Sequence, residues 1–106
     1  MTLTLEEAWI KAAVEHRKLE ITYVNPETRL QYLKREIEPD TVTVSGEKVH
    51  YWAVLSHIPH VGPKAFVPDY FKDVKVTDKT FTPRPGARWH ELQAVYDQHG
   101  LASKQF

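Results

Sequence analysis

The chain has 106 residues, of which 42% are hydrophobic and 11% aromatic. These values are typical of a single folded domain with a modest core, and they exclude a disordered chain. Fourteen basic residues balance fourteen acidic ones and there is no cysteine, so a disulfide framework is excluded and any polyanion site must be a local patch. No apolar run reaches the roughly 20 residues of a membrane span, and the amino terminus lacks the pattern of a secretory signal. We therefore expect a cytoplasmic protein without a membrane partner.

A helix is predicted close to the amino terminus. Thr4 and Glu7 have the spacing of a capping box, in which each side chain accepts a hydrogen bond from the backbone amide of the other residue. We expect the helix to cover residues 5–17. Helical spacing places four apolar residues on one face: Leu5, Ala8, Trp9 and Ala12. Such a face packs either on the domain core or on a partner, and its width favours the core.

After the helix the apolar residues recur at every second position, which predicts strands. We expect strands at residues 19–24, 29–38, 41–45, 48–56, 64–67 and 73–77. The strand 48–56 is apolar on both faces, as is typical of a central strand. Its Tyr51 and Trp52 point to opposite faces because neighbouring strand residues alternate. One ring should therefore fill the core, while the other lies under a helix or on the outer wall.

A second helix is predicted at about residues 87–98, after a stretch rich in proline and glycine. We expect one face of it, with Trp89, Leu92 and Tyr96, to form a docking surface on an outer wall or on a second copy of the chain. Together the elements predict a mainly β, α+β fold. This fold is a small, strongly bent antiparallel sheet or partly open barrel with an N-terminal helix and a C-terminal helix.

Several short segments occur in the order of a known family. Tyr23 ends the first predicted strand, Arg35 stands four residues before Pro39, and the aromatic pair Tyr51–Trp52 follows. In this order they resemble a WYL domain, an Sm/SH3-like barrel named for a Trp-Tyr-Leu run. The aromatic pair is reversed here, and Ala53 replaces the leucine.

A later WYL motif has a basic residue and a phenylalanine, then an Asp-Arg-Ile-like run. It falls on Lys64, Phe66 and residues 69–71, with Tyr70 in place of the arginine. The resemblance covers roughly residues 8–82. It implies a WYL-like barrel domain at 1–82, to which we add a C-terminal helical extension at 83–106 packed on the same domain.

The resemblance also implies a function. WYL domains are ligand-sensing modules of bacterial transcription regulators, usually attached behind a DNA-binding domain, so a chain without one would need a partner to regulate transcription. They are thought to bind nucleic acid or nucleotide-like ligands through basic and aromatic residues. The corresponding ligand-binding residues here are Tyr23, Arg35, Trp52, Lys64, Phe66 and Tyr70.

Arg35 is the polar residue that most needs an explanation. It shares a predicted strand face with Leu33 and Ile37, and a guanidinium on an apolar face is costly unless it meets a carboxylate or a bound anion. One interpretation pairs Arg35 with Asp69 or Asp40 in a structural ion pair. The other directs its forked donors to a phosphate.

The aromatic residues also have two roles open to them. Tyr23, Trp52 and Phe66 either belong to the core or stack on bases, as rings do in proteins that bind single strands. If a phosphate-bearing ligand binds, Arg35 and Lys64 should lie close together on one surface, with a tyrosine ring beside them.

The sequence offers no catalytic pattern. No nucleophile has a base at a motif spacing, and there is no glycine-rich phosphate loop. His57 and His60 form the closest histidine pair, but two histidines alone do not make a tetrahedral metal site. We therefore expect no enzyme, no cofactor and no metal.

Two hypotheses of different classes follow. The first is a non-enzymatic ligand-sensing or accessory regulatory module that recognises single-stranded nucleic acid or a nucleotide. The alternative is a protein–protein interaction adaptor or a homodimerising barrel without a ligand site.

Overall fold

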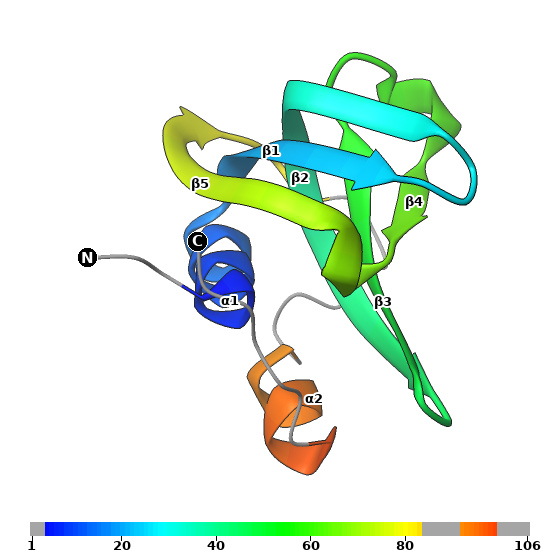
Figure 1. Ribbon diagram of the computed structural model, residues 1–106. Coiled ribbons are helices and arrows are strands. Elements are labelled where there is room, and N and C mark those ends of the chain that lie inside the picture. The colour runs from blue at the N-terminus through cyan, green and yellow to red at the C-terminus, as the bar shows by residue number, and fades with distance from the viewer. Residues whose placement is uncertain (1–3, 84–91, 100–106) are drawn as a thin grey trace.

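The computed structural model describes residues 4–83 and 92–99, where one helix precedes five strands and a second helix follows (Figure 1). The helices are α1 (Leu5–Glu15) and α2 (Leu92–His99), and there are two short 3-10 helices, η1 (Pro59–Val61) and η2 (Pro68–Tyr70). The strands are β1 (Arg17–Asn25), β2 (Leu30–Ser45), β3 (Lys48–Leu55), β4 (Pro63–Phe66) and β5 (Phe71–Thr80).

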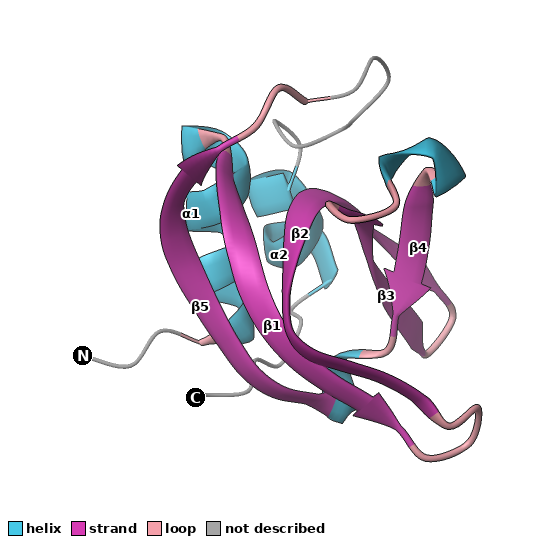
Figure 2. Cartoon of the chain, turned by 90° about the horizontal axis from the view of Figure 1, so that it is seen from above, coloured by secondary structure: helices cyan, strands magenta, loops and turns pink. Residues whose placement is uncertain are grey.

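The five strands form one antiparallel sheet in the order β4-β3-β2-β1-β5. Strand β2 has 16 residues and is shared between two partners. Its first half pairs with β1 and its second half pairs with β3, so the sheet changes direction along β2. Figure 2 shows the result, with β1 and β5 on one side of the bent sheet and β3 and β4 on the other. The predicted mainly β, antiparallel fold with an N-terminal helix is confirmed.

The predicted strands 29–38 and 41–45 are in fact one strand, and this corrects the sequence analysis. Pro39 lies opposite Ala53 and Thr41 lies opposite Trp52, so that Asp40 is an extra residue between two regular pairs. Proline cannot donate to a ladder and ends most strands, but a bulge tolerates it. The proline therefore marks a bend in β2 and not its end.

The end of α1 is also earlier than predicted. The helix stops at Glu15, because His16 adopts a left-handed conformation with φ of 54° and closes the helix with its backbone N–H. Strand β1 begins at once with Arg17. After β5, the neighbour of β1, the chain returns to this point, since the Phe81 N–H donates to the His16 carbonyl oxygen at 2.9 Å.

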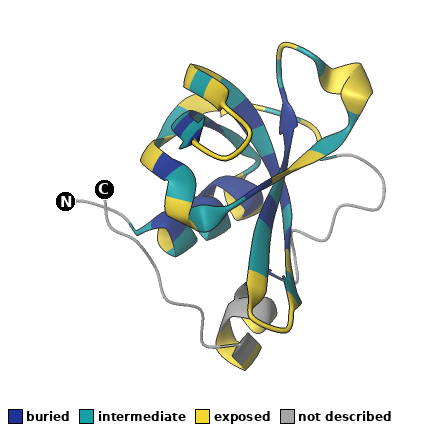
Figure 3. Cartoon of the chain, turned by 45° about the vertical axis from the view of Figure 1, so that its right-hand side comes forward, coloured by how far each residue is buried: buried dark blue, intermediate teal, exposed yellow. Residues whose placement is uncertain are grey.

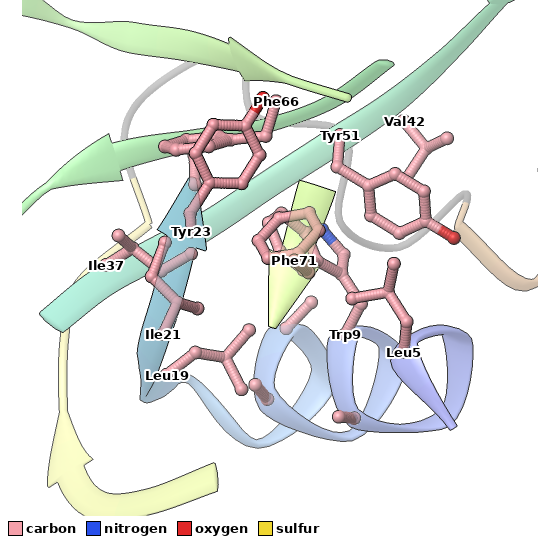
Figure 4. Packing of buried hydrophobic residues seen from close by; sticks show 14 of the residues in the cluster. Leu5, Trp9, Leu19, Ile21, Tyr23, Ile37, Val42, Tyr51, Phe66 and Phe71 are labelled. Atoms are coloured by element: carbon pink, nitrogen blue, oxygen red, sulfur yellow. The ribbon is translucent and has the colours of Figure 1, made fainter. Parts of the chain in front are cut away.

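Helix α1 packs on the sheet through the face that its sequence predicts. The capping box of Thr4 and Glu7 is present at its start. Five residues of the helix are buried: Leu5, Ala8, Trp9, Ala12 and Ala13. The Trp9 ring meets Tyr51 edge to face at a centroid distance of 5.0 Å and Phe71 at 6.0 Å (Figure 4). The expectation that this face packs on the core is confirmed.

The side chains of Tyr51 and Trp52 lie on opposite faces of β3, as the alternation of a strand requires. Tyr51 is buried in the core, where it packs against Trp9. Trp52 is half-buried, and its Nε1–H donates to the Thr43 Oγ1 at 2.8 Å on neighbouring β2. Only one ring of the pair belongs to the core, as expected. Figure 3 shows buried residues along the strands and α1, with exposed residues both at turns and along these elements.

Helix α2 packs against β2 and α1. Its first residue, Leu92, is fully buried and belongs to the same hydrophobic core as Trp9. Trp89, which was predicted to share its face, lies outside the described residues. Neither helix in residues 4–83 and 92–99 combines the length and the apolar character that a membrane crossing requires.

Candidate functional site

The six residues predicted to bind a ligand do not gather in one place. Tyr23 and Phe66 lie in the core, 2% and 1% exposed, with their rings 4.9 Å apart and perpendicular. The Tyr23 hydroxyl accepts a hydrogen bond of 3.0 Å from the Val67 backbone N–H. Their burial favours the core interpretation for both rings. Trp52 lies on the outer face of β3, where Thr43 holds its ring nitrogen.

Tyr70 lines a cavity with an excess of negative charge, here called the acidic cavity, of about 560 Å³. Its charged lining residues come from two turns, the start of β3 and η2: Glu27, Glu47, Lys48 and Asp69. Desolvation raises the pKa of the Tyr70 hydroxyl, and the nearby Glu27 carboxylate raises that pKa further. Three carboxylates against one lysine disfavour an anion beside Tyr70, so the surroundings do not support the role predicted for it.

Lys64 lines a second cavity, the aromatic cavity, of about 290 Å³. Lys64 is exposed on β4, and the rings of Tyr23 and Phe66 also contribute to the lining. Tyr32 and His50 line the same cavity from β2 and β3. One predicted cation thus lies among rings, but Arg35 is absent from this lining.

Arg35 lines a third cavity, the basic cavity, of about 300 Å³. The lining residues are Lys18, Lys34, Arg35, Glu36, Ser56 and His57. Strand β3 separates the strand of Arg35 from the strand of Lys64. The structure therefore does not bring Arg35 and Lys64 to one cavity, and the predicted pairing of these two cations is not found.

The structural ion pair that was considered for Arg35 is also not found. Arg35 is exposed, and within residues 4–83 and 92–99 it makes no ion pair with Asp69, Asp40 or any other carboxylate. Leu33, which was predicted to share its apolar face, is 60% exposed. The guanidinium is therefore available to a ligand.

A bulge in β2 explains why Leu33 does not reach the core. Tyr32 lies opposite Tyr23, while Arg35 lies opposite Ile21. Between these pairs β2 has one residue more than β1, and Lys34 there has a left-handed φ of 49°. A bulge of this kind bends the strand and changes where its side chains point. It keeps Arg35 in register with the core face, although the sheet leaves it exposed.

The charges around the basic cavity favour an anion. The Glu36 carboxylate lies 2.9 Å from the Lys79 Nζ, and Lys79 is not part of the lining. The Lys18 Nζ lies 3.8 Å from the Glu38 carboxylate, a long and therefore weak pair. Lys34 and Arg35 have no ion pair within the described part of the chain. Their charges remain uncompensated at the cavity.

We expect Lys34→Gly to stabilise the fold by about 0.5–1 kcal/mol and to weaken anion binding. A left-handed conformation costs a residue with a Cβ about 1–2 kcal/mol, and glycine avoids this cost but loses about 0.5–1 kcal/mol of chain entropy. Lys34→Ala removes the same charge without the relief. Urea unfolding should rank Lys34→Gly above Lys34→Ala. Equal stability of the two variants would contradict strain at this bulge.

The sequence analysis missed five lining residues of the basic cavity: Lys18, Lys34, Glu36, Ser56 and His57. Lys34 and Glu36, the direct neighbours of Arg35, were the available signal, since the other three come from distant segments. No group of three or more histidine, aspartate or glutamate side chains in residues 4–83 and 92–99 is placed to hold a metal ion.

No protein-family model and no curated protein sequence matches the chain. A solved structure does match: proteasome accessory factor B/C (PafBC) of Arthrobacter aurescens, with a TM-score of 0.58 and 17% sequence identity over 71% of this chain. The matched region is 11% of the PafBC chain, so the chain corresponds to one small part of that protein. At this identity the likeness shows a shared fold.

Proposed function

We propose that the chain is a WYL-like module with an Sm/SH3-like barrel that binds single-stranded nucleic acid or a nucleotide. It acts as a cytoplasmic, non-enzymatic accessory to bacterial transcription regulation. Two independent likenesses support this proposal. The order of Tyr23, Arg35 and the later motifs resembles WYL domains, and the fold is similar to part of PafBC, a WYL-domain-containing regulator. In this proposal residues 1–82 form the barrel domain and 83–106 form its helical extension.

The observation that carries the proposal is the exposed and unpaired guanidinium of Arg35 in the described part of the chain. Its guanidinium is exposed, has no carboxylate partner in the described residues, and lines a cavity with two lysines and a histidine. A forked guanidinium with further cations around it suits an oxygen-rich anion such as phosphate. The site residues that remain in the proposal are Arg35 and its neighbours in the basic cavity, with Lys64 in the aromatic cavity as a second contact.

The test is a titration of labelled single-stranded DNA and RNA oligonucleotides at low salt. Arg35→Ala should weaken binding about tenfold or more, because a hydrogen bond to a charged group contributes about 1.5–3 kcal/mol. Lys11→Ala is the matched control, since Lys11 is an exposed cation on α1 outside all three cavities. Equal binding by wild type and Arg35→Ala, or no binding by wild type, would remove the nucleic-acid proposal.

One observation favours the alternative of a protein-interaction adaptor. Leu30 and Leu33 are 49% and 60% exposed on the first half of β2, and exposed apolar surface is available to a protein partner. If no oligonucleotide or nucleotide binds, this adaptor is the function to pursue, and the oligomeric state of the purified protein is the first measurement.

A further inference from the structure

The basic residues of the cavity converge from three segments. Lys18 comes from β1, Lys34 and Arg35 come from β2, and His57 follows the end of β3. The other two cavities do not continue this positive charge. The aromatic cavity has a single lysine, and the acidic cavity has three carboxylates. Among these three cavities, the cations therefore gather in one and do not continue into the other two.

This arrangement suits a phosphomonoester better than an internal phosphodiester. A protein that follows a single strand needs cations spaced along the backbone, because each internal phosphodiester carries one negative charge. A phosphomonoester carries about −1.5 to −2 at pH 7 and offers three acceptor oxygens. The guanidinium fork of Arg35 and the ammonium groups of Lys18 and Lys34 match that concentrated charge and that number of acceptors.

The carboxylates at the border of the cavity also favour a phosphomonoester over an internal phosphodiester. Glu36 is in the lining. Glu38 contacts two lining residues: its carboxylate pairs with Lys18, and its Oε2 accepts a hydrogen bond of 3.4 Å from the Ser56 hydroxyl. An internal phosphate has a nucleotide chain on both sides, so the border must accommodate a further phosphate in each direction. Lys79 and Lys18 pair with the two carboxylates, but neither glutamate can donate a hydrogen bond to such a phosphate. A terminal phosphate continues on one side only and can leave them untouched.

We infer that the basic cavity recognises a phosphomonoester, either the terminal phosphate of a nucleic-acid strand or that of a free mononucleotide. The inference rests on the proposed function and makes it narrower. Arg35 is the central contact, with Lys34 and Lys18 completing the charge. Internal phosphodiesters contribute little to the affinity.

The experiment compares oligonucleotides of one sequence that differ only at their ends. Three 12-mers with an internal fluorophore carry a 5′-phosphate, a 3′-phosphate or two hydroxyl ends, and each is titrated against the full chain. We expect at least one phosphorylated 12-mer to bind about tenfold or more tightly than the hydroxyl form, in line with charge-assisted hydrogen bonds. A phosphorylated 6-mer should show the same salt dependence as the 12-mer, because the number of counterions released does not grow with length.

Competitors separate the two sources of the ligand. AMP, 3′,5′-cyclic AMP, adenosine and inorganic phosphate are added to the preformed complex. Displacement by AMP at the concentration at which cyclic AMP and adenosine fail supports recognition of the monoester. The concentration of AMP that displaces the labelled 12-mer is then compared with the concentration of unlabelled phosphorylated 12-mer that does so. A lower value for AMP identifies a free mononucleotide as the ligand, and a lower value for the 12-mer identifies a strand end.

Two variants connect the effect to the cavity. Arg35→Ala should abolish the difference between phosphorylated and hydroxyl ends, whereas Lys11→Ala should preserve it. Both side chains are exposed, so we expect both variants to fold, and circular dichroism checks this. Equal binding of all three 12-mers, with a loss in Arg35→Ala, would overturn the monoester inference and leave nucleic-acid binding standing. A preference for phosphorylated ends that survives Arg35→Ala would overturn the assignment to this cavity. Failure of every probe to bind would overturn both.

Discussion

Replacing Trp9 by alanine is expected to destabilise the protein by about 3–5 kcal/mol, the usual cost of removing a large buried ring. Trp9 is 0% exposed and packs against rings from two different strands, Tyr51 at 5.0 Å and Phe71 at 6.0 Å. Its removal leaves a cavity where α1 meets the sheet. Because small domains have a free energy of unfolding of about 5–15 kcal/mol, this loss is a large fraction of the total. Urea unfolding followed by circular dichroism measures it.

Val14→Ala is the control for Trp9→Ala on the same helix. Val14 is 55% exposed, so its truncation should change the free energy of unfolding by about 0.5 kcal/mol or less. A loss below about 1 kcal/mol in Trp9→Ala would mean that α1 contributes little to the core, and it would contradict the packing described above.

Tyr23→Phe should cost about 1–3 kcal/mol of stability while keeping the ring contacts. The change removes only the hydroxyl that accepts the Val67 N–H at 3.0 Å. An amide that loses its partner away from water costs about this much. The bond joins β1 to the segment that leads from β4 to β5, so the variant should also loosen η2. Amide hydrogen exchange at Val67 would show this directly.

Tyr32→Phe makes the same chemical change with a different expected result. Tyr32 is half-buried beside Tyr23, and its hydroxyl makes no hydrogen bond with the described residues. Its loss should leave stability nearly unchanged. If Tyr23→Phe and Tyr32→Phe were equally stable, the hydroxyl of Tyr23 would have no structural role and a ligand contact would become the better explanation.

Local rules allowed much of the fold to be read from the sequence. The capping box of Thr4 and Glu7 and the buried face of α1 depend on spacings within a few residues, and both were predicted. The opposite fates of Tyr51 and Trp52 follow from the alternation of a strand. These features need no knowledge of what the chain packs against.

The basic cavity depends on information that local patterns do not carry. Lys34 adopts a left-handed conformation without being glycine, so nothing in its own identity marks the bulge. The bulge exists because β1 has one residue fewer between the pairs that flank it, which is a property of two strands together. His57 joins the cavity only after β3 has returned beside β2. Reading β2 as a regular strand therefore misplaced Leu33 and gave Arg35 the wrong neighbours.

The hydrogen bond between the Phe81 N–H and the His16 carbonyl has a consequence for protein engineering. It brings the entrance of β1 and the exit of β5 to the same spot, 2.9 Å apart at these two atoms. A sheet whose two chain ends lie together can be inserted into a surface loop of a host protein without separating the two ends of that loop. It can also be circularly permuted with a short peptide bridge, leaving new ends at an exposed turn such as Glu47. Because α1 supplies the buried Trp9 to the core, such a graft must carry α1 or a substitute for it.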